Sequence, residues 1–166
     1  MAMIQKGSIK YYQFDSFSEM NIIHGVFTRH GGVSPQPWAS LNVGGSIGDS
    51  RENVLDNIAR SFSAVGRELS SRFDVWQVHG TDVICTDVPR PIDTPYPEAD
   101  SIITDHPEIT LYMRFADCVP ILLVDPVRRV VGLVHSGWQG TVKRAAFFAI
   151  QAMVEKYHCA PENIHA

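Results

Sequence analysis

The sequence has few charged residues, no basic excess and no long apolar run. Charged side chains make up 19% of its 166 residues, against about 25% in an average soluble domain, and the formal net charge is −4. A chain without a basic excess is poorly suited to neutralise a phosphate backbone, which argues against a nucleic-acid partner. The apolar segment 119–124 is far shorter than a membrane span, and residues 1–7 lack the apolar core of a signal peptide. We therefore expect a cytoplasmic protein that binds neither nucleic acid nor membrane.

Cysteine is also scarce. The three cysteines, Cys85, Cys118 and Cys159, are odd in number and form no CxxC pair, which argues against a disulfide scaffold and favours a reducing compartment. Hydrophobic residues make up 45% of the chain, and a chain of this length buries roughly 70% of its unfolded surface. It can therefore fold without a disulfide or a metal, and its length suggests one domain over residues 1–166.

Apolar periodicity predicts short strands, turns and two helices. A first helix should begin with Asp49 as N-cap and Glu52 completing a capping box, and a second should cover residues 138–157. This pattern favours an α+β fold, with mostly antiparallel sheet and packed helices in a single domain. Residues 161–166 resemble a turn leading into a further strand, so we expect a domain truncated at its C-terminus. The predicted strands lie within residues 8–27 and at residues 75–79, 83–86, 101–104, 109–115, 121–124 and 130–135.

One predicted hairpin brings a thiol and an imidazole together. Strands 121–124 and 130–134 are joined by five residues, which is too short for a parallel crossover, so the strands must be antiparallel. A hairpin centred near Val127 places Cys118 opposite His135 or the residue after it. Opposed residues have Cβ atoms about 4.5–5.5 Å apart, which allows both side chains to bind one metal ion or to form a thiol–imidazole pair.

His79 is a candidate third ligand, because it ends an apolar segment just before a glycine. The set of His79, Cys118 and His135 would form a His2Cys zinc site with one position open, as in catalytic zinc sites. The spacings of 39 and 17 residues match no zinc-finger pattern. A metal-free cysteine hydrolase therefore stays open as an alternative, with Cys118 as nucleophile and His135 as its base. Asp117 is a candidate to orient an imidazole or to take a proton.

Two further segments are suited to anions. Residues 136–140 are rich in small residues and precede a predicted helix, where free backbone N–H groups favour an anion. Residues 27–34 carry Arg29 beside the Gly31-Gly32 pair, and an arginine can hold a phosphate or carboxylate through two hydrogen bonds. This second segment is neither a Walker loop nor a GxGxxG motif.

Five motifs occur in the order found in a known family. They are FTRHGGVS at 27–34, SLNVG at 40–44, QVHG at 77–80, ADCVP at 116–120 and HSGWQG at 135–140. Together they resemble the YfiH-type family, long labelled multicopper polyphenol oxidases or laccase-domain proteins. Its members are now described as zinc-containing purine nucleoside phosphorylases that also deaminate adenosine. The resemblance begins at about Gly25 and extends through residue 166.

The resemblance implies that His79, Cys118 and His135 hold a zinc ion in the active site. It also implies that the substrates are phosphate and a purine nucleoside such as adenosine, inosine or 5′-methylthioadenosine. The family usually has arginine where this chain has a glutamine at position 139. The roles that we expect for the remaining site residues are phosphate binding for Arg29, substrate positioning for Asn42, proton transfer for Asp117 and substrate binding for Ser40 and Gln139.

The older family label suggests a copper-dependent polyphenol oxidase as a second alternative. A type-1 copper site takes two histidines, a cysteine and a weak axial methionine. A multicopper oxidase needs many more histidines, typically in HxH pairs, for its trinuclear centre. The chain has seven histidines, and no two of them are separated by a single residue. The sequence therefore favours zinc over copper.

Overall fold

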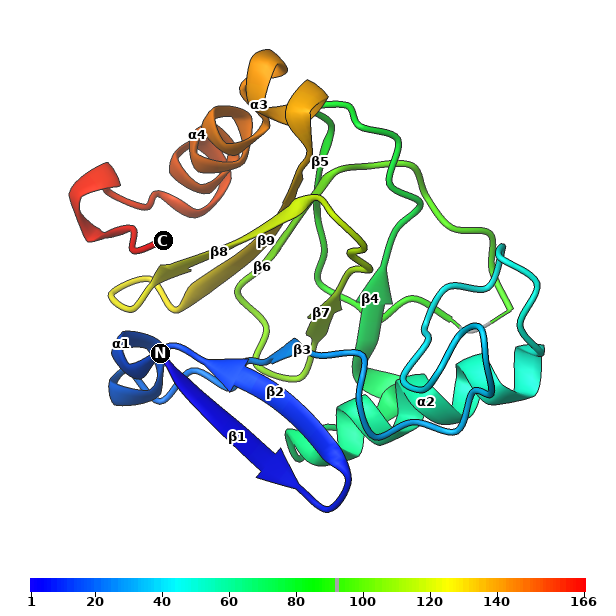
Figure 1. Cartoon of the computed structure of the whole chain (residues 1–166). Helices are drawn as coiled ribbons and strands as arrows, with labels where there is room; N and C mark the ends of the chain where they lie inside the picture. The colour runs from blue at the N-terminus through cyan, green and yellow to red at the C-terminus, as the bar shows by residue number, and fades with distance from the viewer. Residues whose placement is uncertain (92) are drawn as a thin grey trace. The chain divides into compact units, whose positions relative to one another are not determined.

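A computed structural model describes residues 1–91 and 93–166, which form two compact units, Met1–Leu69 and Ser70–Ala166. We call them the N-terminal and C-terminal units. Sheets and helices alternate irregularly along the chain, and most strand pairs are antiparallel, as the predicted α+β fold requires (Figure 1). None of the helices in the described residues is long and apolar enough to cross a membrane.

The N-terminal unit contains a three-stranded antiparallel sheet and one long helix. The sheet has the order β1-β2-β3, and its core side chains are Ile9, Tyr11, Leu41 and Ala64. Because Tyr11 and Ile9 alternate with more exposed residues, one face of β2 is buried and the other is not. The elements are β1 (Ala2–Lys6), β2 (Ile9–Gln13), α1 (Asp15–Glu19), β3 (Val26–Phe27) and α2 (Arg51–Ala64).

The first long helix, α2, begins one residue later than predicted. Ser50 is its N-cap, and its hydroxyl accepts a hydrogen bond from the backbone N–H of Asn53 at 3.1 Å. Asp49 was the predicted N-cap, but its carboxylate accepts hydrogen bonds from Ser34 Oγ at 2.6 Å and Asn42 Nδ2 at 2.8 Å. The prediction was wrong because these loop side chains compete for the Asp49 carboxylate, which local sequence does not reveal.

The C-terminal unit is built on a four-stranded sheet with the order β5-β6-β9-β8. Strands β5 and β6 are parallel, and the other neighbours are antiparallel. Helix α4 (Ala145–Tyr157) packs on this sheet through Ala149 and Met153, which contact a core that includes Ile103, Leu123 and Val134. The strands are β4 (Arg72–Asp74), β5 (Val83–Cys85), β6 (Ser101–Thr104), β7 (Thr110–Tyr112), β8 (Val119–Asp125) and β9 (Val130–Ser136), of which β4 and β7 form a separate parallel pair.

The predicted strand 75–79 is wrong. Strand β4 ends at Asp74, and beyond it only an isolated bridge joins Trp76 to Glu98. His79 adopts a left-handed backbone conformation with φ of 58°, which is far from the φ of about −120° to −140° of a regular strand. The backbone N–H groups of residues 78–80 donate to a carboxylate, Asp100, instead of to a neighbouring strand.

The predicted helix 138–157 is divided in two. Helix α3 (Trp138–Lys143) ends at Arg144, whose φ of 67° is left-handed, and α4 (Ala145–Tyr157) begins directly after it. Thr141 Oγ1 donates to the carbonyl of Gly137 at 3.0 Å, and a threonine that bonds back in this way tends to bend a helix.

Short 3-10 turns lie at Leu69–Ser71 (η1) and Pro161–Asn163 (η2). After η2, His165 forms an antiparallel bridge with Val124 through two backbone hydrogen bonds of 2.8 and 2.9 Å. The segment after residue 160 thus makes the turn and the strand-like pairing that its composition indicates.

Candidate metal centre

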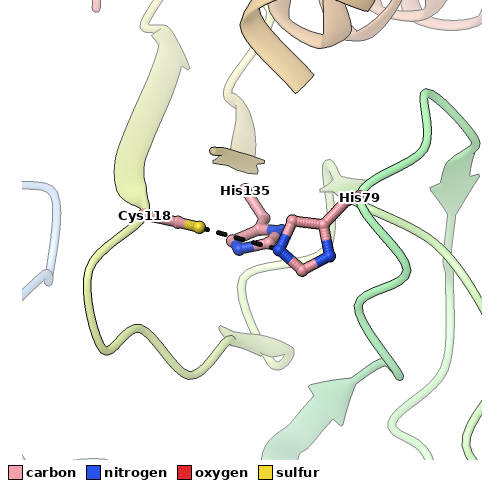
Figure 2. A group of neighbouring side chains, drawn as sticks. All are labelled: His79, Cys118 and His135. Atoms are coloured by element: carbon pink, nitrogen blue, oxygen red, sulfur yellow. Dashed lines mark hydrogen bonds between the residues drawn. The ribbon is translucent and has the colours of Figure 1, made fainter. Parts of the chain in front are cut away.

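The side chains of His79, Cys118 and His135 converge in the C-terminal unit, as Figure 2 shows. Their donor atoms lie within 4.8 Å of one another, and Cys118 Sγ is 3.8 Å from His79 Nε2. In a tetrahedral zinc site with ordinary bond lengths, the ligand atoms are about 3.5 Å apart. The three donors are therefore close enough to hold a single ion. Across residues 1–91 and 93–166, no other group of three or more His, Cys, Asp or Glu side chains converges in this way.

The hairpin of β8 and β9 brings Cys118 and His135 together, but in a register that differs from the predicted one. His135 pairs with Pro120, so Cys118 lies beyond the paired strand rather than opposite His135 or the residue after it. The register differs because Asp125 pairs with Val130 and leaves a four-residue turn. The proximity of the two side chains was predicted correctly, and the pairing that produces it was not.

A fully buried carboxylate, Asp100, supports two of the three ligands. Its Oδ1 is 2.7 Å from His135 Nδ1 and accepts the backbone N–H of His79 at 3.0 Å. Its Oδ2 accepts the N–H groups of Val78 and Gly80 at 3.2 and 2.6 Å. Because Nδ1 of His135 is engaged with Asp100, its Nε2 is the nitrogen left to bind a metal.

Asp100 is absent from the residues predicted from the sequence. One signal points to it, because Ser101 pairs with Val134 in the antiparallel ladder of β6 and β9. The position before Ser101 must then lie opposite the position after Val134, which is His135. That signal becomes usable only once β6 and β9 are known to be neighbours.

The electrostatics of the cluster favour a carboxylate at Asp100 and a protonated thiol at Cys118. Burial acts to raise the pKa of Asp100, but the hydrogen bonds from His135 and the three backbone amides outweigh it and hold the pKa below its ordinary value. Burial, followed by the negative charge and hydrogen bond of Asp117, raises the pKa of the Cys118 thiol. A bound cation acts in the opposite direction, because it favours the thiolate.

The cluster is closed on the His135 side and more open at the other two ligands. The His135 side chain is 5% exposed, and its ring contacts the ring of His79 edge-on, with centroids 4.9 Å apart, and the ring of Phe115 at 5.6 Å. His79 and Cys118 are half-buried. Three ligands with one more accessible side leave room for a further ligand, which is the arrangement of catalytic zinc sites.

Helix α3 contacts the backbone of His79 through the side chain of Lys143. Lys143 Nζ donates to the carbonyl of His79 at 2.7 Å and to Gln139 Oε1 at 3.3 Å. Gln139, a predicted substrate-binding residue, therefore accepts a hydrogen bond from Lys143, which also bonds to the backbone of the metal ligand His79. Asp117, the predicted proton carrier, is exposed and directly precedes Cys118.

The other predicted residues, Arg29, Ser40 and Asn42, belong to the N-terminal unit, and their roles stay predictions. The Arg29 guanidinium is exposed, and its Nε donates to the carbonyl of Ala39 at 2.9 Å. Ser40 Oγ accepts the backbone N–H groups of Gly31 and Gly32 at 3.0 and 3.2 Å. Asn42 Nδ2 donates to a carboxylate, Asp49, and its Oδ1 accepts the N–H of Gly44. Ser40 thus ties its own motif to the motif at residues 27–34, and Asn42 holds the loop of its own motif in place.

Asn57 organises these same loops and was also missed. It is completely buried on α2. Its Oδ1 accepts the N–H of Val33 at 2.9 Å, and its Nδ2 lies 2.8 Å from both Ser34 Oγ and the carbonyl of Asn42. One amide therefore joins two of the five motifs.

Comparison with known proteins identifies relatives of this fold. The family model described as multi-copper polyphenol oxidoreductase laccase matches residues 23–166. The purine nucleoside phosphorylase ORF3 of Streptomyces griseus is 41% identical over 134 residues, which cover 79% of this chain and 54% of that protein. The purine nucleoside phosphorylase YlmD of Geobacillus stearothermophilus is 35% identical over 149 residues, covering 86% of this chain and 54% of that protein.

A solved structure matches as well. The crystal structure of YlmD from Geobacillus stearothermophilus aligns with a TM-score of 0.87 and 32% identity, over 98% of this chain and 62% of that one. The chain spans about half the length of the curated relatives that it matches.

Proposed function

The chain belongs to the YfiH-type family, described as multi-copper polyphenol oxidoreductase laccases, and from this premise we propose that it is a zinc-dependent purine nucleoside phosphorylase that also deaminates adenosine. The observation that carries the proposal is the convergence of His79, Cys118 and His135 on one point. The names of the relatives from Streptomyces griseus and Geobacillus stearothermophilus support the reaction class.

The donor set suits zinc. Two imidazoles and one thiolate match the borderline-soft character of Zn²⁺, whereas magnesium and calcium prefer oxygen ligands. His135 and His79 would each bind through Nε2, and Cys118 through Sγ. Zinc bound there would supply Lewis-acid catalysis.

For phosphorolysis, phosphate would attack C1′ of the ribose while the purine leaves. Arg29 would bind the phosphate, because a guanidinium offers five N–H donors and Ala39 engages only part of them. Gln139 would hold the nucleoside, and the roles of Ser40 in substrate binding and of Asn42 in substrate positioning stay predictions. Asp117 would pass a proton to a ring nitrogen of the departing base, for which its exposed position beside Cys118 is suited.

For deamination, water would replace the amino group at C6 of adenosine and release ammonia. The same three ligands and the same proton carrier, Asp117, would serve this reaction. The H-x-E and P-C-x-x-C signature of the familiar nucleobase deaminases is absent from the sequence, so the site would have arisen separately.

The test is incubation of zinc-loaded protein with adenosine, with and without phosphate, followed by chromatography. We expect adenine and ribose 1-phosphate only when phosphate is present, and inosine in either case. Cys118→Ser should abolish both activities and the bound zinc. Cys85→Ser is the matched control, because Cys85 is half-buried on β5 and lies outside the cluster. Unchanged adenosine in folded, zinc-loaded protein would contradict the proposal.

A metal-free cysteine hydrolase is the second candidate, and one observation favours it. Asp100 orients the predicted base, His135, and a ligand nitrogen of His135 lies within 4.8 Å of Cys118 Sγ, as a nucleophile, a base and an orienting carboxylate require. The imidazole in direct contact with the thiol is that of His79, at 3.8 Å. Stoichiometric zinc in the purified protein would exclude this candidate. Activity that survives chelation and is lost on thiol alkylation would support it.

The copper oxidase alternative has its own test. A multicopper centre needs several ions, and the described residues bring together one group of three donors. We therefore expect copper-loaded protein to leave phenolic substrates unoxidised in air.

A further inference from the structure

We propose that Asp100 is a positioning residue that fixes two metal ligands, His79 and His135, in the geometry that binds the ion. The proposal rests on the metal centre of the proposed function. In this proposal, Asp100 determines the tautomer of the His135 imidazole and the backbone conformation of His79. Asp100 lies at the start of β6, between the two segments that it joins, and none of its side chain is exposed.

The first step concerns His135. Its Nδ1 is 2.7 Å from Asp100 Oδ1, and a carboxylate at this position can only accept a hydrogen bond. The proton of the neutral imidazole must therefore sit on Nδ1, which leaves the Nε2 lone pair for a metal. A carboxylate that holds a histidine in this way fixes the ring orientation and makes the ligand nitrogen more basic.

The second step concerns His79. Three consecutive backbone N–H groups, at Val78, His79 and Gly80, point to the two oxygens of Asp100. Consecutive amides converge on one anion only where the backbone takes an unusual turn, and His79 supplies it with a φ of 58°. A left-handed conformation is unfavourable for a residue with a side chain. The hydrogen bonds to Asp100 therefore hold His79 in a conformation that it would otherwise leave.

The third step concerns the chemical identity of residue 100. Among residues 1–91 and 93–166, the two oxygens meet four N–H donors and no hydroxyl or other acceptor within hydrogen-bond distance. A carboxylate satisfies all four donors, whereas an asparagine must turn an NH2 group toward some of them. Asp100→Asn thus preserves size and removes half of the acceptors, which isolates the proposed role.

The test compares Asp100→Asn with Asp125→Asn in the full chain. Asp125 is also fully buried and accepts two backbone N–H groups, from Val127 and Arg128, but it lies at the turn end of the β8–β9 hairpin, away from His135. The zinc affinity is measured by competition with a chromophoric chelator. We expect it to fall by about 10–100-fold in Asp100→Asn, the usual cost of losing such a partner, and to stay unchanged in Asp125→Asn.

A spectroscopic readout separates positioning from general stability. In cobalt-substituted protein, the visible d–d bands report the ligand geometry, and we expect them to shift in Asp100→Asn and not in Asp125→Asn. Equal zinc affinity and identical cobalt spectra in wild-type and Asp100→Asn protein would overturn the proposal. Cys118→Ser distinguishes this result from failure of the metal site itself. If Cys118→Ser also binds zinc normally, the proposed metal centre is refuted. If Cys118→Ser loses zinc, the metal centre stands and only the proposed role of Asp100 is refuted.

A measurement on the unaltered protein covers the case in which Asp100→Asn does not fold. Long-range ¹H–¹⁵N correlation spectra report which imidazole nitrogen carries the proton. We expect the Nδ1-protonated form for His135 in both metal-free and zinc-loaded protein. A proton on Nε2 in the metal-free state would overturn the proposal.

Discussion

Gly137 lies so close to Cys118 that a Cβ atom at residue 137 would stand 2.6 Å from the Cys118 sulfur. The same Cβ would lie 3.3 Å from Cδ2 of His79. Gly137 has an ordinary extended backbone, with φ of −73° and ψ of −176°, so its role is the close approach of two ligands rather than an unusual turn. The glycine at the start of α3 is thus part of the candidate metal centre, although it contributes no donor atom.

Gly137→Ala should displace the Cys118 sulfur and weaken metal binding. Non-bonded carbon atoms settle at about 3.5–4.0 Å, so the added methyl must push the sulfur away by roughly 1 Å. We expect the zinc affinity to fall by about 10-fold or more, as it does when a ligand loses its orientation. Gly45→Ala is the matched control, because a Cβ there meets nothing within 4 Å. Chelator competition gives both affinities, and equal values in the two variants would refute the role of Gly137.

Gln77→Ala should loosen the segment that carries Cys118. Gln77 Nε2 donates to the carbonyl of Arg114 at 2.8 Å, and its Oε1 accepts the N–H of Arg114 at 3.1 Å. This two-point contact ties the His79 segment to the residues that lead into Cys118. We expect faster hydrogen exchange at residues 114–118 and faster zinc release in Gln77→Ala. Gln77→Glu retains the acceptor for the Arg114 N–H and loses the donor, so its values should lie between those of Gln77→Ala and wild type. Exchange rates that match wild type in both variants would argue against the tie.

The parts of the site that follow from local sequence were predicted, and the parts that depend on distant pairing were not. The loop between β8 and β9 is short enough to require a hairpin, which places Cys118 and His135 at the same end of it even though the predicted register differs from the observed one. Asp100 was missed because it is 35 residues from His135 in the chain, and no local pattern shows that β6 and β9 are neighbours. His79 was placed in a strand because it ends an apolar segment, whereas its backbone accepts a conformation set by the carboxylate of Asp100.

Asn57 illustrates the same limit in the N-terminal unit. Asparagine has a poor propensity for helix, so its presence inside a helix does not by itself indicate a structural role. Nothing in the sequence distinguishes Asn57 from Asn53 one turn earlier. Only the packing of α2 against the loops at residues 33–42 reveals that Asn57 is buried and bonded to two loop segments, at residues 33–34 and at Asn42. The α+β class was predictable because it needs only the types of the elements and not their contacts.

Asn57→Ala should destabilise the protein strongly. The change removes the partner of the buried Ser34 hydroxyl and of the partly buried N–H of Val33 and carbonyl of Asn42. Each buried polar group left unpaired costs about 1–3 kcal/mol, so we expect the free energy of unfolding to fall by about 2–5 kcal/mol. Asn53→Ala is the matched control on the same helix. Its side chain makes one hydrogen bond, to Asp49 at 3.1 Å, and should cost about 1 kcal/mol or less. Urea unfolding measures both, and equal losses would show that Asn57 does not organise the loops.

Asp49→Asn should remove an acid-sensitive part of the stability. Hydrogen bonds from Asn42 and Ser34, followed by those from Asn53 and the Ser50 backbone, lower the pKa of Asp49 from 3.8 to about 2. A carboxyl whose pKa is lower in the folded state than in the unfolded state stabilises the fold above its unfolded pKa, and this contribution is lost as the pH falls through the folded value. Wild-type protein should therefore have a higher Tm than Asp49→Asn at pH 7, and the difference should shrink between about pH 4 and pH 2. Thermal unfolding of both proteins across this range is the measurement. The metal ligands are the same in both, so their own acid sensitivity cancels in the difference. A gap in Tm that stays constant down to pH 2 would mean that the Asp49 carboxylate contributes no acid-sensitive stability to the fold.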